Sequence, residues 1–505
     1  MKGEYVDDVP YVRHFLDELA PARLRLTAAV NGFTPPPADD FDYCEIGCAH
    51  GDTMIALAAA HPRARFVGID IVDEHVTSAK KLARDAGLEN VGVLERDVAD
   101  LVDSDDVGEL DYVVAHGVLS WVSPATRQAL VAFAAKKLRP GGLLYVSYNA
   151  MPGWAAVEPL RQLLLLPRGE GPSLERAERG LAFANAMREA GADYFAKNPL
   201  SEEMLATMTR AGLRYVAHEY LHEHWSPMYF ARVAWEMAAA DLHFAGTLPL
   251  YTTFADTVLP ESAVALLAKV DDRITFESLK DFAVNETFRR DVYVKGTSSR
   301  HPGAKDVYLD ETPWGTTASE PPADPKVSLP HRTVTLGAEE DAVFASLLRG
   351  GARLADLPLE MPMPARRRAI ARLASVERVL PLLEATRSPA FASEARFDVP
   401  LTYNQATLRK LTSGAPLVVA SERAGTGFPI SALEALAMRA VTEARGPERD
   451  AWVDALVARS VLRLRVGDHA IEAPDDQRAT IREAITVLVE KKLAKMLELG
   501  ILAAS

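Results

Sequence analysis

The sequence has little cysteine and no long apolar run. These absences bear on whether the protein forms disulfides and whether it inserts into a membrane. Cys44 and Cys48 are its only cysteines. Because they lie four positions apart across one strand and turn, we expect reduced structural thiols and no disulfide framework. No uncharged apolar run reaches about eighteen residues, so we expect no membrane insertion. Residues 1–8 are acidic and contain no apolar signal core, which leads us to expect a cytoplasmic protein.

Positive charge is also scarce. The formal net charge is −14, which argues against non-specific nucleic-acid binding and is compatible with a cationic protein substrate. We therefore expect no nucleic acid as a partner. Apolar residues make up 48% of the 505 residues, enough for a substantial core, and this length corresponds to about three domains.

Residues 42–51 contain the turn around which the rest of the chain is organised. They predict a short buried strand, a glycine-bearing turn with Gly47 and Gly51, and a helix that opens near Asp52. Glycine lets the backbone approach a ligand closely because it has no Cβ. The helix N-terminus presents free N–H groups to an electron-rich partner. Glu45, at the end of the strand, is placed to reach the amino-acid portion of that ligand.

A second strand, at residues 66–70, ends in an acid about twenty residues further on. Asp70 is therefore placed to accept both hydroxyls of a ribose. The glycine turn alone could be an ordinary strand-to-helix turn, but its pairing with Asp70 favours nucleoside binding. Both a dinucleotide fold and an S-adenosylmethionine (SAM) fold fit this pattern. The turn is not Gly-x-Gly-x-x-Gly and Glu45 precedes it, which favours SAM.

Strands and helices alternate along the first third of the chain. A helical lead-in over residues 1–40 ends in three prolines, and a core over residues 41–154 follows. Its expected strands are 43–46, 65–69, 91–95, 111–115 and 143–148, and its expected helices are 52–60, 73–86 and 124–138. This order predicts an α/β, Rossmann-like, doubly wound parallel sheet with right-handed crossovers. Ligands bind at the carboxyl ends of such strands, which selects Glu45, Gly47, Asp70, Asp97, His116 and Tyr148.

Two loops at this edge carry further candidates. Asp97 and Val98 follow the third strand, where an acid can bond the exocyclic amine of adenine and a backbone N–H can serve a ring nitrogen; the alternative for Asp97 is a helix N-cap. His116 and Trp121 lie in the loop after the fourth strand. The Trp121 ring can cap a sulfonium, wall an acceptor pocket, or simply pack the loop down.

Beyond the core, residues 155–212 predict a helical insertion that lids the sheet or pairs with a second subunit. Residues 213–216 favour a strand, residues 230–240 a helix, and residues 242–247 a strand that completes the sheet. The string His218-Glu219-Tyr220-Leu221-His222 formally matches a zinc motif. It lacks a long helical frame, so we expect polar packing and no metal.

The last third of the chain is expected to be mainly helical. We expect core completion and a regulatory domain over residues 213–300, a linker over 301–330, and a C-terminal domain over 331–505. Helical periodicity occurs at 366–373, 431–444 and 481–497, and residues 461–466 can form a hairpin arm. Short helices with a hairpin favour a winged-helix-like module; a generic docking or dimer domain is the alternative.

Several motifs together resemble one family. The specific ones are His-Gly-Val-Leu-Ser-Trp-Val at 116–122 and Ser-Tyr-Asn at 147–149, and further matches lie at 9–11, 45–48, 66–70, 152–154, 218–221 and 227–230, with a weaker one at 420–436. The chain resembles the bacterial class I SAM-dependent methyltransferases that carry a methyltransferase regulatory domain. That group includes the rickettsial protein lysine methyltransferases that act on outer-membrane proteins.

The resemblance implies SAM as cofactor. The cofactor site would then comprise Glu45, Gly47, Cys48, Gly51, Asp70, Ile71, Asp97, Val98, His116 and Trp121. It also implies substrate contacts from the middle and C-terminal domains, a homodimer, and a structural role for residues 218–225. Ala49 stands where the family usually has a second glycine. If the backbone there needs a positive φ, alanine costs about 1 kcal/mol and weakens SAM binding.

Methyl transfer from a sulfonium is an in-line displacement, so the protein mainly aligns the reacting atoms. A lysine amine, with a pKa of about 10.4, must lose its proton first. Tyr148, Asn149 and His116 are the candidates that orient the acceptor or take this proton. The Asp/Asn-Pro-Pro-Tyr string of planar-nitrogen methylation is absent. We therefore expect a protein lysine N-methyltransferase, whose substrate can be an outer-membrane or surface protein. The alternatives are a small-molecule or peptide natural-product methyltransferase and a non-catalytic SAM-binding scaffold.

Overall fold

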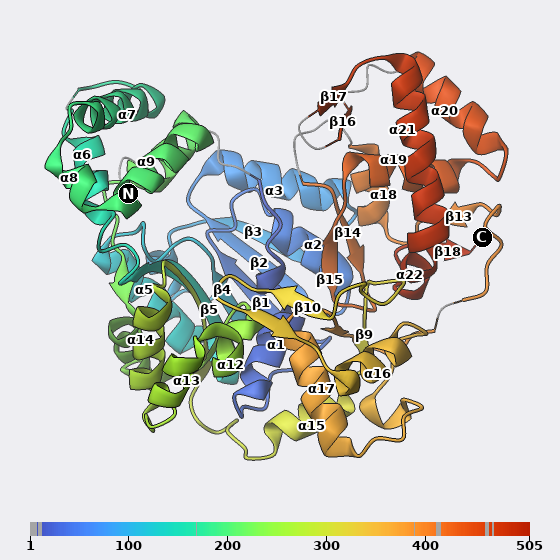
Figure 1. Cartoon of the computed structure of the whole chain (residues 1–505), viewed down its shortest axis with the longest axis horizontal. Helices are drawn as coiled ribbons and strands as arrows, with labels where there is room; N and C mark the ends of the chain where they lie inside the picture. The colour runs from blue at the N-terminus through green and yellow to red at the C-terminus, as the bar shows by residue number, and fades with distance from the viewer. Residues whose placement is uncertain are drawn as a thin grey trace.

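The computed structural model describes residues 8, 13–167, 169–387, 389–410, 416–459, 464–466 and 469–504. A central sheet forms the middle of the molecule (Figure 1). A group of helices, α6 to α9, stands at the upper left of that view, and the C-terminal helices stand at the upper right. The motif at 9–11 lies outside the described residues.

The central sheet has the strand order β3-β2-β1-β4-β5-β8-β7. Its parallel strands are β1 (Asp42–Ile46), β2 (Arg65–Asp70), β3 (Val91–Glu95), β4 (Leu110–Ala115) and β5 (Leu138–Met151). β8 (Phe288–Lys295) runs antiparallel to both β5 and β7 (Leu242–Thr247), so the sheet is mixed and not parallel throughout. The short β6 (Met228–Tyr229) pairs with the end of β5. The Rossmann-like core is confirmed, as is the prediction that 242–247 completes the sheet.

The crossover helices begin and end within about two residues of their predicted bounds. They are α2 (Asp52–Ala60), α3 (Asp73–Asp85) and α5 (Pro124–Lys137). The short α4 (Val98–Leu101), which has no counterpart among the predicted helices, follows β3, and the lead-in holds η1 (Asp17–Leu19) and α1 (Pro21–Val30). Capping explains one of these starts: the Ser123 side chain accepts from the Thr126 N–H, and Pro124 occupies the first helical position.

Helix α2 is buried along its whole length. One side packs on the sheet, and the hairpin of β14 (Val418–Ser421) and β15 (Thr426–Pro429) covers the other (Figure 1). His61, just past the helix, hydrogen bonds through Nε2 with the Gly425 carbonyl at 2.9 Å. The apolar sequence of this helix therefore has a physical cause, because a helix enclosed on all sides is apolar all round.

The insertion after β5 is helical, as predicted. It contains α6 (Glu158–Leu165), α7 (Ser173–Glu189), α8 (Asp193–Lys197), α9 (Pro199–Ala211) and α10 (Leu213–Tyr220). The strand predicted for residues 213–216 is wrong, because these residues form the first turn of α10. Val216, Ala217 and Tyr220 are buried among the apolar side chains of α6, α7 and α9. This packing stabilises the helix, because the local pattern of four residues is too short to determine the conformation.

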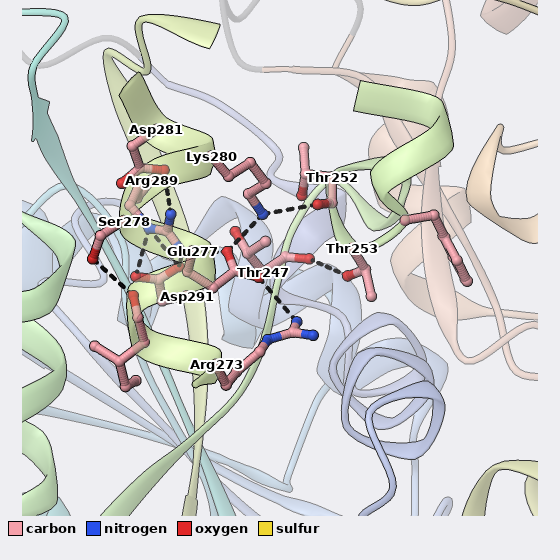
Figure 2. Close-up of polar contacts among 12 residues, drawn as sticks. Thr247, Thr252, Thr253, Arg273, Glu277, Ser278, Lys280, Asp281, Arg289 and Asp291 are labelled. Atoms are coloured by element: carbon pink, nitrogen blue, oxygen red, sulfur yellow. Dashed lines mark hydrogen bonds and ion pairs between the residues drawn. The ribbon is translucent and has the colours of Figure 1, made fainter. Parts of the chain in front are cut away.

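A buried group of ion pairs joins β8 to the helices that follow β7. These helices are η2 (Leu250–Thr253), α12 (Ala255–Val258), α13 (Glu261–Leu267) and α14 (Arg273–Val284), and α11 (Phe230–Ala238) precedes β7. Figure 2 shows Arg289 among three acids, Glu277, Asp281 and Asp291. Lys280 pairs with Glu277 at 2.6 Å and donates to the Thr252 carbonyl at 2.8 Å. These buried side chains are not hydrated, so each charge is compensated by an opposite charge.

The stretch expected to be a loose linker, 301–330, is in fact partly helical. It contains α15 (Ala304–Glu311), β9 (Trp314–Gly315) and β10 (Lys326–Ser328). Trp314 is fully buried, together with Tyr308 and Leu309, and these side chains tie the stretch into a core. The polar composition of the segment concealed this aromatic anchor. Next come β11 (Thr333–Thr335), α16 (Ala338–Leu347), η3 (Leu354–Asp356), α17 (Met363–Ser375) and β12 (Leu380–Pro381).

The C-terminal region is mainly helical, as predicted. Its elements besides β14 and β15 are β13 (Phe397–Asp398), α18 (Thr402–Arg409), α19 (Ala432–Glu443), α20 (Glu448–Arg459), β16 (Leu464–Val466), β17 (His469–Ile471), α21 (Pro474–Val487), the π-helical η4 (Leu488–Lys492), α22 (Leu493–Glu498) and β18 (Ala503–Ala504). β16 and β17 form the expected hairpin; residues 461–463 of its predicted arm lie outside the described residues. The winged-helix character and the domain boundaries stay predictions. Among the described residues, no helix is both long and apolar enough to cross a bilayer.

Candidate functional site

The turn after β1 holds three residues with positive φ. Gly47 and Gly51 have φ of 72° and 74°, in the left-handed region that glycine adopts freely. Ala49 lies in the same region with φ of 45°. The condition under which Ala49 is unfavourable is therefore met. An L-residue in this conformation costs about 1–2 kcal/mol.

Asp70 fastens this turn to the end of β2. Its Oδ2 accepts from the Ala49 N–H at 2.8 Å, and its Oδ1 accepts from the Val72 N–H at 2.9 Å. His75 Nδ1 lies 3.3 Å from Oδ1. The carboxylate thus orders two neighbouring loops. Each carboxylate oxygen has further lone pairs, so Asp70 can also accept from a ligand.

A first cavity, of about 220 Å³, lies over the carboxyl ends of β1, β2 and β3. It is lined by nine of the ten residues expected to bind cofactor, namely Glu45, Gly47, Cys48, Asp70, Ile71, Asp97, Val98, His116 and Trp121. Gly51 does not line the cavity. It is the N-cap of α2, at the end of the turn after β1. Cys44 and Cys48 are buried and free. The carboxyl-end rule therefore located this cavity from the sequence.

Glu45 is the most perturbed acid in the first cavity. Its side chain is buried, and Oε2 has no hydrogen-bond partner among the described residues. Burial, with the nearby negative charges of Asp52 and Asp70, raises the pKa of Glu45 to about 8. An unpaired buried carboxyl in a cavity suits a cationic group, because a positive charge there restores its ionised form.

Sequence reasoning missed the part of this cavity that comes from the lead-in. Arg13 and His14 line it, and Arg13 Nε donates to Asp52 Oδ2 at 2.8 Å. The Leu16 N–H donates to Thr53 Oγ1 at 3.0 Å, which holds the lead-in against the first turn of α2. No motif marks Arg13, since its partner lies 39 positions away.

Asp97 is the N-cap of α4: its Oδ1 accepts from the Ala99 N–H at 3.0 Å. The capping alternative is therefore confirmed. Asp97 and Val98 also line the first cavity, so the adenine role stays a prediction that this capping bond allows.

A second cavity, of about 360 Å³, adjoins the first. His116, Gly117 and Trp121 line both cavities and form the boundary between them. Its other walls come from the end of β5 and the turn after it, from α9 and α10, and from the start of β8. They comprise Asn149, Trp154, Met204, Tyr215, His218, Glu219, Tyr220, His222, Thr287 and Phe288.

The two boundary side chains are held by their neighbours. His116 Nδ1 hydrogen bonds with the Tyr145 hydroxyl at 3.0 Å, and the two rings stack. Burial lowers the pKa of His116 to about 3, so the ring is neutral at pH 7. Trp121 Nε1 donates to the Glu219 carbonyl at 3.4 Å, which links the loop after β4 to α10.

Tyr148 does not reach either cavity. Its ring is fully buried on the opposite face of β5, and its hydroxyl donates to Asp291 Oδ2 at 2.6 Å. The expectation that Tyr148 orients the acceptor is contradicted by this position. Successive side chains of a strand point to opposite faces, so Tyr148 and Asn149 cannot both face one site. Tyr145 and Ser147, which sequence reasoning overlooked, share the face of Asn149: Ser147 Oγ accepts from the Gly117 N–H at 2.8 Å.

Asn149 does face the second cavity. Its amide Nδ2 is buried with no hydrogen-bond partner within the described part of the chain. Ser120 Oγ accepts from the Asn149 backbone N–H at 2.8 Å and fixes this end of β5. The side-chain amide is thus positioned and left to bond a ligand.

The histidine- and glutamate-rich stretch after residue 217 forms a wall of the second cavity. His218 and Glu219 lie in the last turn of α10, which ends at Tyr220, and His222 follows it. Among the described residues, no group of three or more His, Cys, Asp or Glu side chains is arranged to hold a metal ion.

Comparisons with known proteins agree with this geometry. Residues 44–144 match the family described as "Methyltransferase domain", and residues 213–295 match the one described as "Predicted methyltransferase regulatory domain". The first match contains the loops after β1 to β4, and the second contains α10 and β8.

Three uncharacterised bacterial proteins are similar in sequence. Protein sll1526 of Synechocystis sp. is 36% identical over 295 residues, which cover 58% of each chain. RP789 of Rickettsia prowazekii is 29% identical over 291 residues, 56% of this chain and 51% of that one. The chain thus spans little more than half the length of these two relatives. RP028 of the same organism is 31% identical over 228 residues, 44% of this chain and 90% of that one.

The solved structure of PKMT2 from Rickettsia typhi in complex with AdoHcy has the same fold over nearly the whole chain. The TM-score is 0.73, with 18% identity, and the superposition covers 98% of this chain and 100% of PKMT2. At this identity the likeness concerns the fold alone. The two domain matches and the relationship to RP028 agree with this fold. The chain belongs to the class I SAM-dependent methyltransferases that carry a methyltransferase regulatory domain.

Proposed function

We propose that this protein binds SAM in the first cavity and transfers its methyl group to an acceptor that enters through the second cavity. The observation that carries the proposal is the adjacency of the two cavities, which share the wall formed by His116, Gly117 and Trp121. A donor site and an acceptor site must meet at the reacting atoms, since displacement at a methyl carbon requires nucleophile and leaving group in line.

The residues of the first cavity fit the parts of SAM. Glu45, whose Oε2 lacks a partner in the described chain, would hold the ammonium of the methionine portion. Asp70 would accept from the ribose hydroxyls, and Asp97 from the adenine amine. SAM, when bound, supplies an electrophilic methyl group on a sulfonium. The Trp121 ring, on the boundary, is placed to stabilise that positive charge.

We propose a protein lysine side chain as the acceptor. The resemblance to protein lysine methyltransferases set out above supports this choice, as does a second cavity whose lining contains no lysine or arginine among the described residues. An outer-membrane or surface protein is the substrate class that the resemblance suggests. A small-molecule or peptide substrate remains the alternative within the same reaction class.

A non-catalytic SAM-binding scaffold is the alternative outside enzymes. The positive φ of Ala49 favours this alternative, because backbone strain in the turn after β1 would lower the affinity for SAM.

Two measurements test the proposal. Calorimetric titration of the full chain with SAM should give saturable binding of one equivalent. Incubation with radiolabelled SAM and host lysate proteins should then label protein, and acid hydrolysis should release methylated lysine. Label that appears only in small molecules would favour the alternative substrate class. Tight SAM binding without transfer to either pool would favour the scaffold.

We also propose a homodimer formed through the helical insertion. Large apolar side chains are exposed on it: Leu166 is 66% exposed, Phe183 43% and Leu200 46%. Sedimentation velocity should give a dimer for the natural chain and a monomer for Phe183→Glu. Leu266→Glu is the matched control, because Leu266 is 65% exposed on α13, away from the insertion. A monomer for the natural chain would refute the proposal.

A further inference from the structure

The second cavity has walls that suit a cation. The rings of Trp121, Trp154, Tyr215, Tyr220 and Phe288 line it. Aromatic faces attract ammonium groups through the ring quadrupole, most strongly where water is excluded. Trp154 is almost fully buried and packs edge-on against Trp225 at 5.1 Å between ring centroids, so this wall is fixed.

One side chain can give this cavity a negative charge. Glu219 is the only acid in the described lining, which also contains no lysine or arginine. His116 and His222 do not offset it, because burial lowers the pKa of His116 to about 3 and that of His222 to about 4. Burial raises the pKa of Glu219 to about 7. The Glu219 carboxyl therefore changes between neutral and negative near neutral pH.

Glu219 is also well positioned relative to the donor side. Its backbone carbonyl accepts from Trp121 Nε1 at 3.4 Å, and Trp121 belongs to the boundary between the two cavities. A carboxylate that titrates near 7 is suited to accept a proton at working pH, since general bases act best when their pKa lies near that pH.

We propose that the second cavity binds the methyl acceptor as a cationic primary amine, and that Glu219 accepts the proton this amine must lose. The inference rests on the proposed function and deepens it, because it names the charge state of the acceptor and the base. Within residues 218–222, it gives Glu219 a catalytic role in place of the polar packing expected from the sequence.

The step balances as follows. The acceptor ammonium transfers one proton to the Glu219 carboxylate and becomes a neutral amine. The nitrogen lone pair forms a bond to the methyl carbon while the carbon–sulfur bond breaks, and that bond's electron pair stays on sulfur. The products are a methylated ammonium, S-adenosylhomocysteine and the protonated Glu219 carboxyl, which then releases its proton to water.

Butylammonium, which has the length and charge of a lysine side chain, is the probe for the acceptor site. Its binding to the full chain can be followed by tryptophan fluorescence, because Trp121 and Trp154 line the cavity. At pH 8 we expect saturable binding, with 1-butanol and butyrate at least tenfold weaker. Affinity for butylammonium should rise with pH through about 7, where Glu219 ionises.

The variant Glu219→Gln should weaken butylammonium binding at least tenfold and remove its pH dependence. The other titratable groups of the wall, His116, His218, His222, Tyr215 and Tyr220, remain in this variant. Glu223→Gln is the matched control: Glu223 is exposed four positions on and does not line the cavity. Equal affinity in the natural chain and Glu219→Gln, or tighter binding of butyrate, would overturn the inference.

A separate SAM titration distinguishes this inference from the proposed function. Glu219→Gln should bind SAM with unchanged affinity, which also shows that the variant is folded. With a lysine-containing peptide that the natural chain methylates, the kcat of Glu219→Gln should be about 10² to 10⁴ times lower than that of the natural chain. The rise of kcat with pH through 7 should disappear in this variant. Failure of the natural chain to bind SAM refutes the proposed function; normal kcat in Glu219→Gln refutes the role of Glu219 alone.

Discussion

Proton release on SAM binding is the sharpest test of the first cavity. Burial beside Asp52 and Asp70 raises the pKa of Glu45 to about 8, so roughly nine in ten Glu45 side chains are protonated at pH 7. An ammonium at Oε2 requires the carboxylate. Glu45 should therefore release about 0.9 proton per SAM at pH 7, as follows from the one-unit gap between pH and pKa. The α-amino group, with a pKa of about 7.7, takes up about 0.2 proton, which leaves a net release of about 0.7.

The same reasoning sets the pH dependence of affinity. An α-amino group keeps its charge below about pH 7.7. Between pH 5.5 and 7.5 the dissociation constant should fall about tenfold per pH unit, because each unit is worth about 1.36 kcal/mol of differential interaction. Above pH 8 the affinity should fall again, since Glu45 is then ionised before the ligand arrives and the α-amino group of the ligand loses its charge.

Calorimetry in buffers of different ionisation enthalpy measures the proton directly. A plot of apparent binding enthalpy against buffer enthalpy should have a slope of about 0.7 proton released at pH 7. The slope should change sign at pH 9, where Glu45 is already ionised and the α-amino group must take up a proton to bind. Glu45→Gln should bind SAM more weakly and lose the slope at pH 7. Binding of SAM to the natural chain with no proton exchange at pH 7 would refute the assignment of Glu45 to the ammonium.

Three further substitutions test single contacts. Ala49→Gly removes the strain at φ 45° and should raise the free energy of unfolding in urea by about 1 kcal/mol; equal or lower stability would mean that no strain is present. Asp70→Asn keeps an acceptor oxygen for the turn but not the charge, and should weaken SAM binding at least tenfold by calorimetry while the melting temperature stays within a few degrees. Tyr148→Phe leaves Asp291 without its hydroxyl donor; it should cost about 1–2 kcal/mol of stability and leave the methyl-transfer rate of the folded enzyme intact, so a large fall in kcat would return Tyr148 to the site.

The core of the fold follows from local patterns. The strand that ends at Ile46 and the helix that begins at Asp52 were placed from the glycine turn between them. The strand that ends at Asp70 was placed from its terminal acid. Parallel strands carry continuous apolar runs that are easily recognised. The carboxyl-end rule then collected the residues of the first cavity without any knowledge of its shape.

The remaining features depend on contacts that local patterns do not encode. Residues 213–216 alternate like a strand, but packing against the insertion makes them helical. Tyr148 was placed at the site although the alternation of β5 could have excluded it. The local sequence predicts only polar packing for Glu219, because the cavity walls that it faces, from Trp121 to Phe288, are distant in sequence. Arg13 reaches Asp52 only through the fold.

The enclosure of α2 has a practical consequence for handling this protein. Met54, Ile55 and Leu57 have no exposed surface, and part of their cover comes from residues 418–429, at the far end of the chain. A fragment that lacks residues 418–429 would expose an apolar surface of α2 beside Gly51 and would aggregate in solution. Crystallisation or screening work should keep the two parts of the polypeptide together. The first turn of α2 lines the first cavity, and the other end of this helix is held at His61 by Gly425, 364 positions further on.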